Sequence, residues 1–299
     1  MEWRRGAAVL ALIVVVVPAV TAWAQQGVVR AWQRRLALSI PLPLPVIEVE
    51  AVDPLAVPVD RAPRLVASVP PRNVPVSGTA RVAAYIDERG RCEGAVPLEV
   101  PFPGIATRLV EKVMGARFEP ARTGKQARPS WAALEIVLAG KVKRAGVLNQ
   151  ALELPDPASP PTPAPKAEPY VSGRLVGLPA ADPDELTTVA SPRRLSVRIP
   201  GLETEAPLRL LVHVTGSGRC DRYVPLEMAP GLRNWTARFL ASWQLEPAVR
   251  DGEAVPAWVI YRSRVELKLS SLSSTTVRVL PKAVFTPVAA PAGSSPSAP

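Results

Sequence analysis

The chain has 299 residues, a length typical of about two domains. Hydrophobic residues make up 47% of it and charged residues 21%, which excludes a wholly disordered chain. One histidine and two cysteines exclude a histidine-rich metal site, a four-cysteine zinc site and a dense disulfide framework. We therefore expect no metal, and no sequence feature predicts a cofactor.

Residues 1–24 have the pattern of a secretory signal peptide. Arg4 and Arg5 form a basic start, an apolar run follows, and Ala22-Trp23-Ala24 is a small-x-small cleavage site. An uncleaved anchor is the alternative, because the apolar run is close to the shortest length that spans a bilayer. The sequence thus predicts a periplasmic protein or, with the anchor retained, an inner-membrane protein that faces the periplasm.

The formal net charge of +10 favours anionic partners. The basic residues are scattered, and an exported protein is separated from the genome, so we expect no nucleic acid partner. The charge is consistent with a solvated basic surface or with peripheral contact with anionic envelope surfaces.

The sequence contains one unit twice. RGRCEGAVPLEV around Cys92 aligns with SGRCDRYVPLEM around Cys220 at a nearly constant offset. The alignment continues through identical residues on either side, which indicates an internal duplication. These pairs include Gly90/Gly218, Glu99/Glu227, Gly104/Gly231, Pro120/Pro247 and Trp131/Trp258.

Each copy predicts the order strand, strand, helix, strand. Apolar residues alternate in two strands around turns that end at Gly90 and Gly218, where a glycine can adopt a positive φ. Helical spacing follows at 105–114 and 232–243, and the prolines at 120 and 247 end these helices. The final strands alternate at Leu134, Ile136 and Leu138 and at Val265, Leu267 and Leu269.

The predicted fold class is α+β, with two β-β-α-β units that each form a small antiparallel sheet covered by one helix. A Pro-rich linker joins them, because prolines concentrate between the copies. The predicted order is a signal peptide at 1–24, a Pro-rich N-terminal segment at 25–63, a first domain at 64–144, a Pro-rich linker at 145–172, a second domain at 173–271 and a disordered Pro/Ala/Ser tail at 272–299.

Both copies resemble the C-terminal domain of TonB proteins. The first copy carries the D-E-R-G-R turn and an F-E-P-A-x-x-G motif from Phe118 to Gly124. The second keeps Gly218 and Pro247, but Leu245 replaces the aromatic residue. The resemblance covers 64–144 and 192–271.

The resemblance implies a periplasmic protein that binds envelope proteins, with outer-membrane transporters as candidate partners. It also implies that the last strand of each copy accepts a partner strand by β-augmentation. The matching positions are Trp131, Leu134, Ile136, Trp258, Val265 and Leu267.

The N-terminal segment departs from the energy-transducing members of that family, which keep a membrane helix with a polar, histidine-bearing face. The sequence therefore predicts a binding or adaptor role. A basic scaffold on anionic envelope surfaces and an energy transducer with an uncleaved anchor remain the alternatives. We find no catalytic constellation and expect no enzyme.

Three kinds of single residue were candidates for chemistry. Cys92 and Cys220 are predicted to be buried free thiols, and a disulfide between them or with another chain is the alternative. His213 is predicted to be a surface residue without an acidic companion. Trp131 and Trp258 are predicted to pack against the helices or to anchor a partner beside the last strand.

Overall fold

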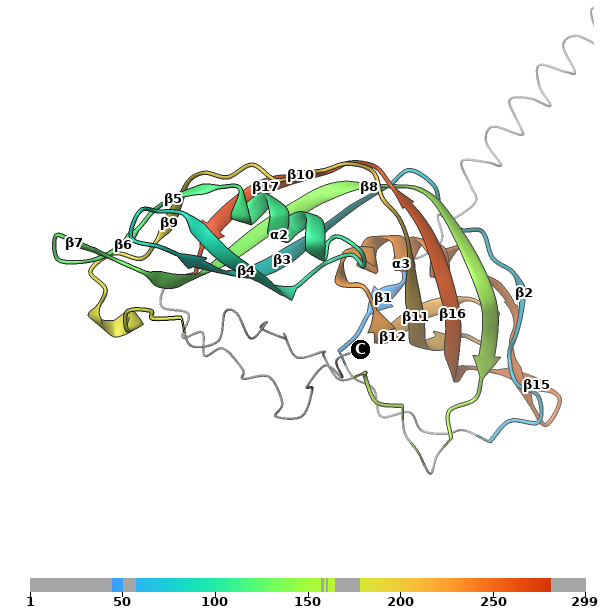
Figure 1. The fold of residues 1–299 in the computed structure, drawn as a ribbon. Coiled ribbons are helices and arrows are strands. Elements are labelled where there is room, and N and C mark those ends of the chain that lie inside the picture. Colours follow the sequence, from blue (N-terminus) through green and yellow to red (C-terminus); the bar gives the residue numbers. More distant parts are fainter. Residues whose placement is uncertain (1–44, 51–57, 157–158, 160, 165–177, 281–299) are drawn as a thin grey trace, which may run out of the picture. The chain divides into compact units, whose positions relative to one another are not determined.

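Strands dominate the part of the chain that the computed structural model describes, which is residues 45–50, 58–156, 159, 161–164 and 178–280 (Figure 1). The predicted signal peptide lies outside the described residues. Within them, no helix is long and apolar enough to cross a membrane.

The first repeat runs through two hairpin strands, a helix and a very long final strand. A two-residue strand, β1 (Ile47–Glu48), precedes it. Its elements are β2 (Arg64–Ala67), β3 (Val74–Ile86), β4 (Cys92–Glu99), α2 (Ala106–Met114), β5 (Arg117–Glu119), β6 (Ala121–Thr123), β7 (Gln126–Arg128) and β8 (Ser130–Glu153).

The second repeat follows the same order and ends in an additional strand. It begins after a 3-10 turn, η1 (Pro183–Glu185). Its elements are β9 (Ser191–Arg194), β10 (Arg198–Ile199), β11 (Glu203–Val214), β12 (Cys220–Met228), η2 (Pro230–Leu232), α3 (Arg233–Ala241), β13 (Gln244–Glu246), β14 (Ala248–Arg250), β15 (Glu253–Val255), β16 (Ala257–Leu269) and β17 (Leu272–Val279).

One nine-stranded sheet contains the hairpin and final strands of both repeats. The first repeat contributes the run β4-β3-β8, which β17 and β10 extend; the second contributes β12-β11-β16, with β1 outside β12. Strand β8 belongs to both halves, because residues 130–142 pair with β3 and residues 142–153 pair with β16. This shared strand can be followed in green in Figure 1.

The predicted fold class, two separate β-β-α-β units on a Pro-rich linker, is wrong. Residues 145–153 were assigned to the linker but form the second half of β8, and residues 272–279 were assigned to the tail but form β17. Each extension pairs with the final strand of the other repeat, and both repeats belong to one compact unit, Pro45–Pro299. Main-chain pairing at otherwise open sheet edges is the physical reason, since an open edge leaves N–H and C=O groups without partners.

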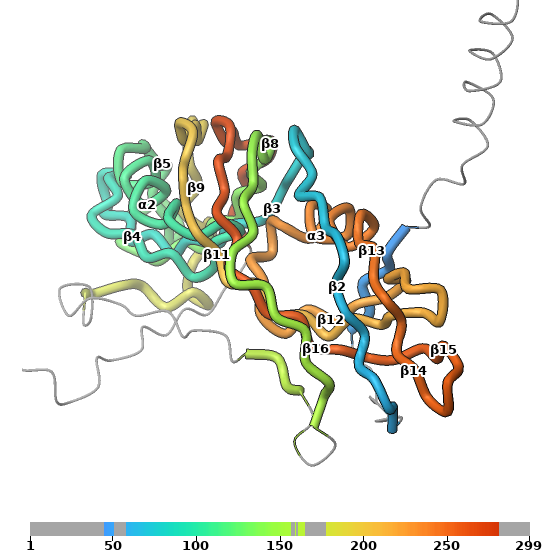
Figure 2. Tube along the Cα trace, turned by 90° about the vertical axis from the view of Figure 1, so that its right-hand side faces the viewer, coloured from blue at the N-terminus to red at the C-terminus, as the bar shows by residue number. Residues whose placement is uncertain are grey.

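The short strands are exchanged between the repeats in the same way. Strand β2 precedes the first hairpin but pairs with β13 of the second repeat, as Figure 2 shows. Strand β9 precedes the second hairpin and pairs with β5 of the first. Because these are equivalent elements, the exchange is reciprocal.

The two helices cover one face of the sheet and share a core. Leu109 and Val113 of α2 are buried, as are Trp235 and Phe239 of α3, whose rings stack at 5.0 Å between centroids. The main core cluster contains residues of both repeats. Both helices end several residues before Pro120 and Pro247, the residues predicted to end them, because β5 and β13 begin within a few residues of the last helical turns.

Candidate functional site

Both edges of β8 are occupied at the positions predicted to accept a partner strand. Leu134 lies opposite Val82 of β3 on one side and Val279 of β17 on the other. Ile136 has partners in the same two strands, and both side chains are fully buried. A partner strand could pair with Leu134 or Ile136 only after β17 had left.

The predicted positions in β16 are enclosed in the same manner. Val265 and Leu267 pair with β11 on one side and with the second half of β8 on the other. Trp258 lies before the first residue of β16 that pairs with β8, and its ring contacts His213 at 5.0 Å between centroids. Trp131 makes the equivalent cross-strand contact with Tyr85, at 5.5 Å between ring centroids. The structure therefore assigns these tryptophans to cross-strand packing.

The outer edge of β12 shows how this sheet takes an added strand. Strand β1 pairs with it in parallel, and the Val49 N–H donates to the carbonyl oxygen of Tyr223 over 2.9 Å. Glu48 accepts a 2.8 Å hydrogen bond from the Tyr223 hydroxyl and forms an ion pair of 3.3 Å with Arg233. Burial, and then the bond to Glu48, raises the pKa of Tyr223 above its usual value. The added strand is thus held by main-chain bonds and by one acidic side chain.

The matching edge belongs to β4. Among the described residues, β4 pairs only with β3. Ala95 lies opposite Ala84 of β3, and Tyr223 lies opposite Val212 of β11. Ala95 and Tyr223 therefore occupy the same register position in the two repeats. Because the Tyr223 carbonyl faces the added strand, we expect the main-chain N–H and C=O of Ala95 to face away from β3.

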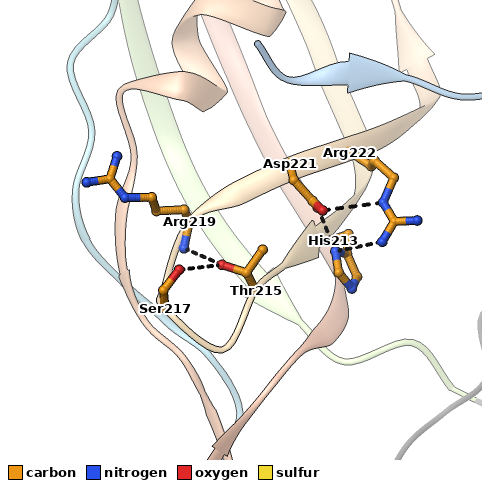
Figure 3. Close-up of polar contacts among 6 residues, drawn as sticks. All are labelled: His213, Thr215, Ser217, Arg219, Asp221 and Arg222. Atoms are coloured by element: carbon orange, nitrogen blue, oxygen red, sulfur yellow. Dashed lines mark hydrogen bonds and ion pairs between the residues drawn. The ribbon is translucent and has the colours of Figure 1, made fainter. Parts of the chain in front are cut away.

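A polar cluster lies where the β11–β12 hairpin turns (Figure 3). His213 Nδ1 is 2.6 Å from Asp221 Oδ1, and the Arg222 guanidinium reaches the other Asp221 oxygen at 3.5 Å. The His213 side chain is only 14% exposed. The prediction of a surface histidine without an acidic companion was wrong, because hairpin pairing places His213 opposite Arg222, next to Asp221.

A histidine oriented by a carboxylate can act as a general base if a nucleophile contacts it. The nearby hydroxyls of Thr215 and Ser217 instead lie 2.9 Å from each other, and Thr215 also accepts a bond from the Arg219 N–H. No hydroxyl or thiol in the described part of the chain hydrogen-bonds to His213. The cluster therefore fixes the turn and the Trp258 ring, and its geometry shows no activated nucleophile.

Cys92 and Cys220 are both buried and free, so the disulfide left open by the sequence is not formed. Burial raises the pKa of Cys92 to about 11 and that of Cys220 to about 12. Neither thiol is therefore a thiolate at neutral pH. Within the described residues, no three histidine, cysteine or acidic side chains form a group that could hold a metal. No family model, curated protein or solved structure matches this chain.

Proposed function

We propose that this protein is an exported binding adaptor that accepts an extended segment of an envelope protein on the outer edge of β4. One observation carries the proposal: the equivalent edge of β12 holds β1 in parallel, whereas β4 pairs only with β3 among the described residues. An edge with free main-chain groups is the usual place for β-augmentation.

The edge of β4 differs from that of β12 in its side chains. Tyr223 and Arg233, which hold Glu48, align with Ala95 and Ala106. A segment bound on β4 would therefore have a small or apolar residue where β1 has Glu48. Pro97 and Pro225 align further along the two strands, where a proline ends main-chain donation, so the expected contact is short.

The remaining support comes from the sequence. The signal-peptide pattern favours export, and the resemblance to TonB C-terminal domains favours envelope proteins, outer-membrane transporters included, as partners. The last strands of the repeats are not the proposed site, because β17 and the second half of β8 already pair with them.

Site-specific photocrosslinking in cells tests this function. A photoreactive residue at Glu93, an exposed position of β4, should crosslink to one segment of an envelope protein, whereas the same residue at Glu88, in the exposed turn, should not. A synthetic peptide of the crosslinked segment should then bind the purified protein, and Ala95→Pro should abolish that binding because the outward N–H is lost. Ala95→Val keeps the N–H and is the matched control.

Two outcomes would contradict the proposal. Peptide binding that survives Ala95→Pro would place the contact elsewhere. Crosslinks spread over many abundant proteins, and binding that disappears by roughly 0.5 M salt, where the screening length is a few ångströms, would favour the basic scaffold on anionic surfaces.

A further inference from the structure

A row of alternating charges crosses the half of the sheet that contains the first repeat. Glu99, Arg81, Glu135 and Arg278 lie opposite one another in β4, β3, β8 and β17. Arg81 is 3.8 Å from Glu99 and 3.7 Å from Glu135, and Arg278 Nε donates to Glu135 over 2.6 Å. The Glu135 carboxylate is only 9% exposed and lies between two guanidinium groups. Every charge in this row has a partner of opposite sign.

The equivalent row of the second repeat lacks that central carboxylate. Glu227, Arg209, Arg262 and Ala151 lie opposite one another in β12, β11, β16 and β8. Arg262 stands where the first row has Glu135, and Ala151 stands where it has Arg278. Two arginines are thus direct cross-strand neighbours, and like charges in that position destabilise a sheet unless an anion lies between them.

Arg209 is the unpaired member of this row. Its Nε is buried and has no hydrogen-bond partner, and its guanidinium forms no ion pair with any described residue. Arg262 forms a 3.4 Å ion pair with Glu153. A buried polar group without a partner is uncommon in native proteins and calls for a ligand or an ordered water.

A shallow cavity of about 330 Å³, open to solvent, lies at this point of the sheet. Its lining is Pro207, Leu208, Arg209, Glu227, Arg262 and Ser263. Both arginines of the second row therefore border one cavity, together with a single carboxylate.

We propose that this cavity binds a carboxylate, supplied by an acidic side chain of a partner peptide. The ligand carboxylate accepts hydrogen bonds from both Arg209 and Arg262 above the face of the sheet, and so supplies the negative charge that Glu135 supplies to Arg81 and Arg278 in the first row. A carboxylate suits the site better than a phosphate does, because Glu227 in the lining repels a doubly charged group more strongly. The site lies on the face of the sheet, and it does not depend on strand addition at β4.

The test is a titration observed by NMR at the arginine Nε–Hε groups. The probe is N-acetyl-glutamate amide, and inorganic phosphate and phosphatidylglycerol vesicles are the comparison ligands. We expect a saturable shift of the Arg209 Nε–Hε signal, which is assigned by its absence in Arg209→Gln. Arg262→Glu restores only the carboxylate that the first row has at this position. It should weaken binding of the probe about ten-fold or more, since it removes a charge-assisted bond and adds a competing carboxylate.

Arg264→Gln is the matched control, because Arg264 lies on the same strand, is exposed and forms its ion pair with Glu205. It should leave the probe's affinity unchanged. Arg262→Glu gains a carboxylate opposite Arg209 but loses the ion pair with Glu153, so its unfolding temperature is measured as well; a variant that is fully folded at the titration temperature shows that weaker binding is not due to unfolding.

No shift at Arg209, or equal weakening by Arg262→Glu and Arg264→Gln, would overturn the proposal. A response to phosphate or vesicles but not to the carboxylate would overturn it in favour of a phosphate or lipid site. Ala95→Pro leaves this cavity intact. Peptide binding at β4 and carboxylate binding at Arg209 can therefore be tested, and can fail, independently of each other.

Discussion

A Cβ atom on Gly218 would lie 2.0 Å from the carbonyl oxygen of Leu245. Gly90 and Phe118 have the same relationship in the first repeat, at 2.1 Å. Both glycines have a positive φ, 73° and 74°, as the sequence predicted for the two turns. Each glycine carbonyl also accepts a bond from the N–H of the residue that approaches it, so each hairpin turn lies directly against the strand after the helix.

We expect Gly218→Ala to destabilise the protein more than an ordinary glycine replacement at positive φ. The left-handed conformation costs a non-glycine residue about 1–2 kcal/mol, and the contact with Leu245 adds to this, so we expect at least ~3 kcal/mol. Gly252→Ala is the control, because Gly252 also has a positive φ but no atom lies within 4 Å of its Cβ position. Urea denaturation measures both, and equal losses would show that the Leu245 contact carries no cost.

The local elements could be predicted from the sequence because their signals are local. Alternation, helical spacing and the turn glycines placed the hairpins, both helices and the cores of the final strands near their observed positions. The end of β8 was missed because residues 143–153 carry a mixed pattern with exposed charges such as Lys143 and Arg144. That pattern suits an edge strand as well as a linker.

No local sequence pattern predicts that the two repeats exchange strands. Ile136 and Val277 are an observed pair, but nothing near either residue in the sequence indicates the other. A duplication supplies two equivalent edges and two equivalent extensions, and either extension could in principle pair within its own repeat. The polar cluster at the β11–β12 turn was missed for a similar reason. The contact between His213 and Asp221 depends on the pairing register of the hairpin, which the sequence pattern does not specify.

Removing β17 should expose the edge of β8 and cause self-association. A chain that ends at Ser270 leaves the main-chain groups of β8 between Leu134 and Ala139 without their partner strand. We expect its mass by light scattering to rise with concentration, because an open apolar edge pairs with another chain. A chain that ends at Leu280 keeps β17 and is the control. Equal masses for the two truncated chains would show that β17 does not protect this edge.

Cys220 should make the stability fall in alkaline solution. Its pKa rises from 9.0 to about 12 in the folded protein, so the folded state keeps the proton that the unfolded state loses. The resulting stabilisation is complete below pH 9 and is lost as the pH rises from 9 towards 12, by about 2 kcal/mol at pH 10.5. Urea denaturation at pH 8 and pH 10.5 should therefore show a larger decrease in the wild type than in Cys220→Ala.

The wild type and Cys220→Ala both retain the buried tyrosines whose pKa values are also raised. The difference between the pH dependences of their stabilities therefore reports on the Cys220 thiol. The same burial should keep Cys220 unreactive towards a thiol reagent at pH 8 until the protein unfolds. Equal pH dependence in the two proteins, or rapid labelling of the native thiol, would contradict a buried, protonated Cys220.

Glu135 should contribute more to stability than any exposed acidic residue of the sheet. Glu135→Gln removes the charge that both Arg81 and Arg278 approach, and Arg278 then keeps no carboxylate partner. We expect a loss of ~1–2 kcal/mol, less than for a fully buried pair because the Arg278 side chain is largely exposed. Glu205→Gln is the control: its ion pair with Arg264 is exposed on both sides, and its loss should cost under ~0.5 kcal/mol.

Thermal and urea unfolding of the two variants at low and high salt would measure this difference. The Glu135→Gln effect should persist at 1 M salt, because the carboxylate is shielded from solvent, whereas the Glu205→Gln effect should vanish. A Glu135→Gln protein as stable as the Glu205→Gln protein would mean that the first charge row contributes little to the fold. The comparison of that row with the Arg209 row would then lose its energetic basis.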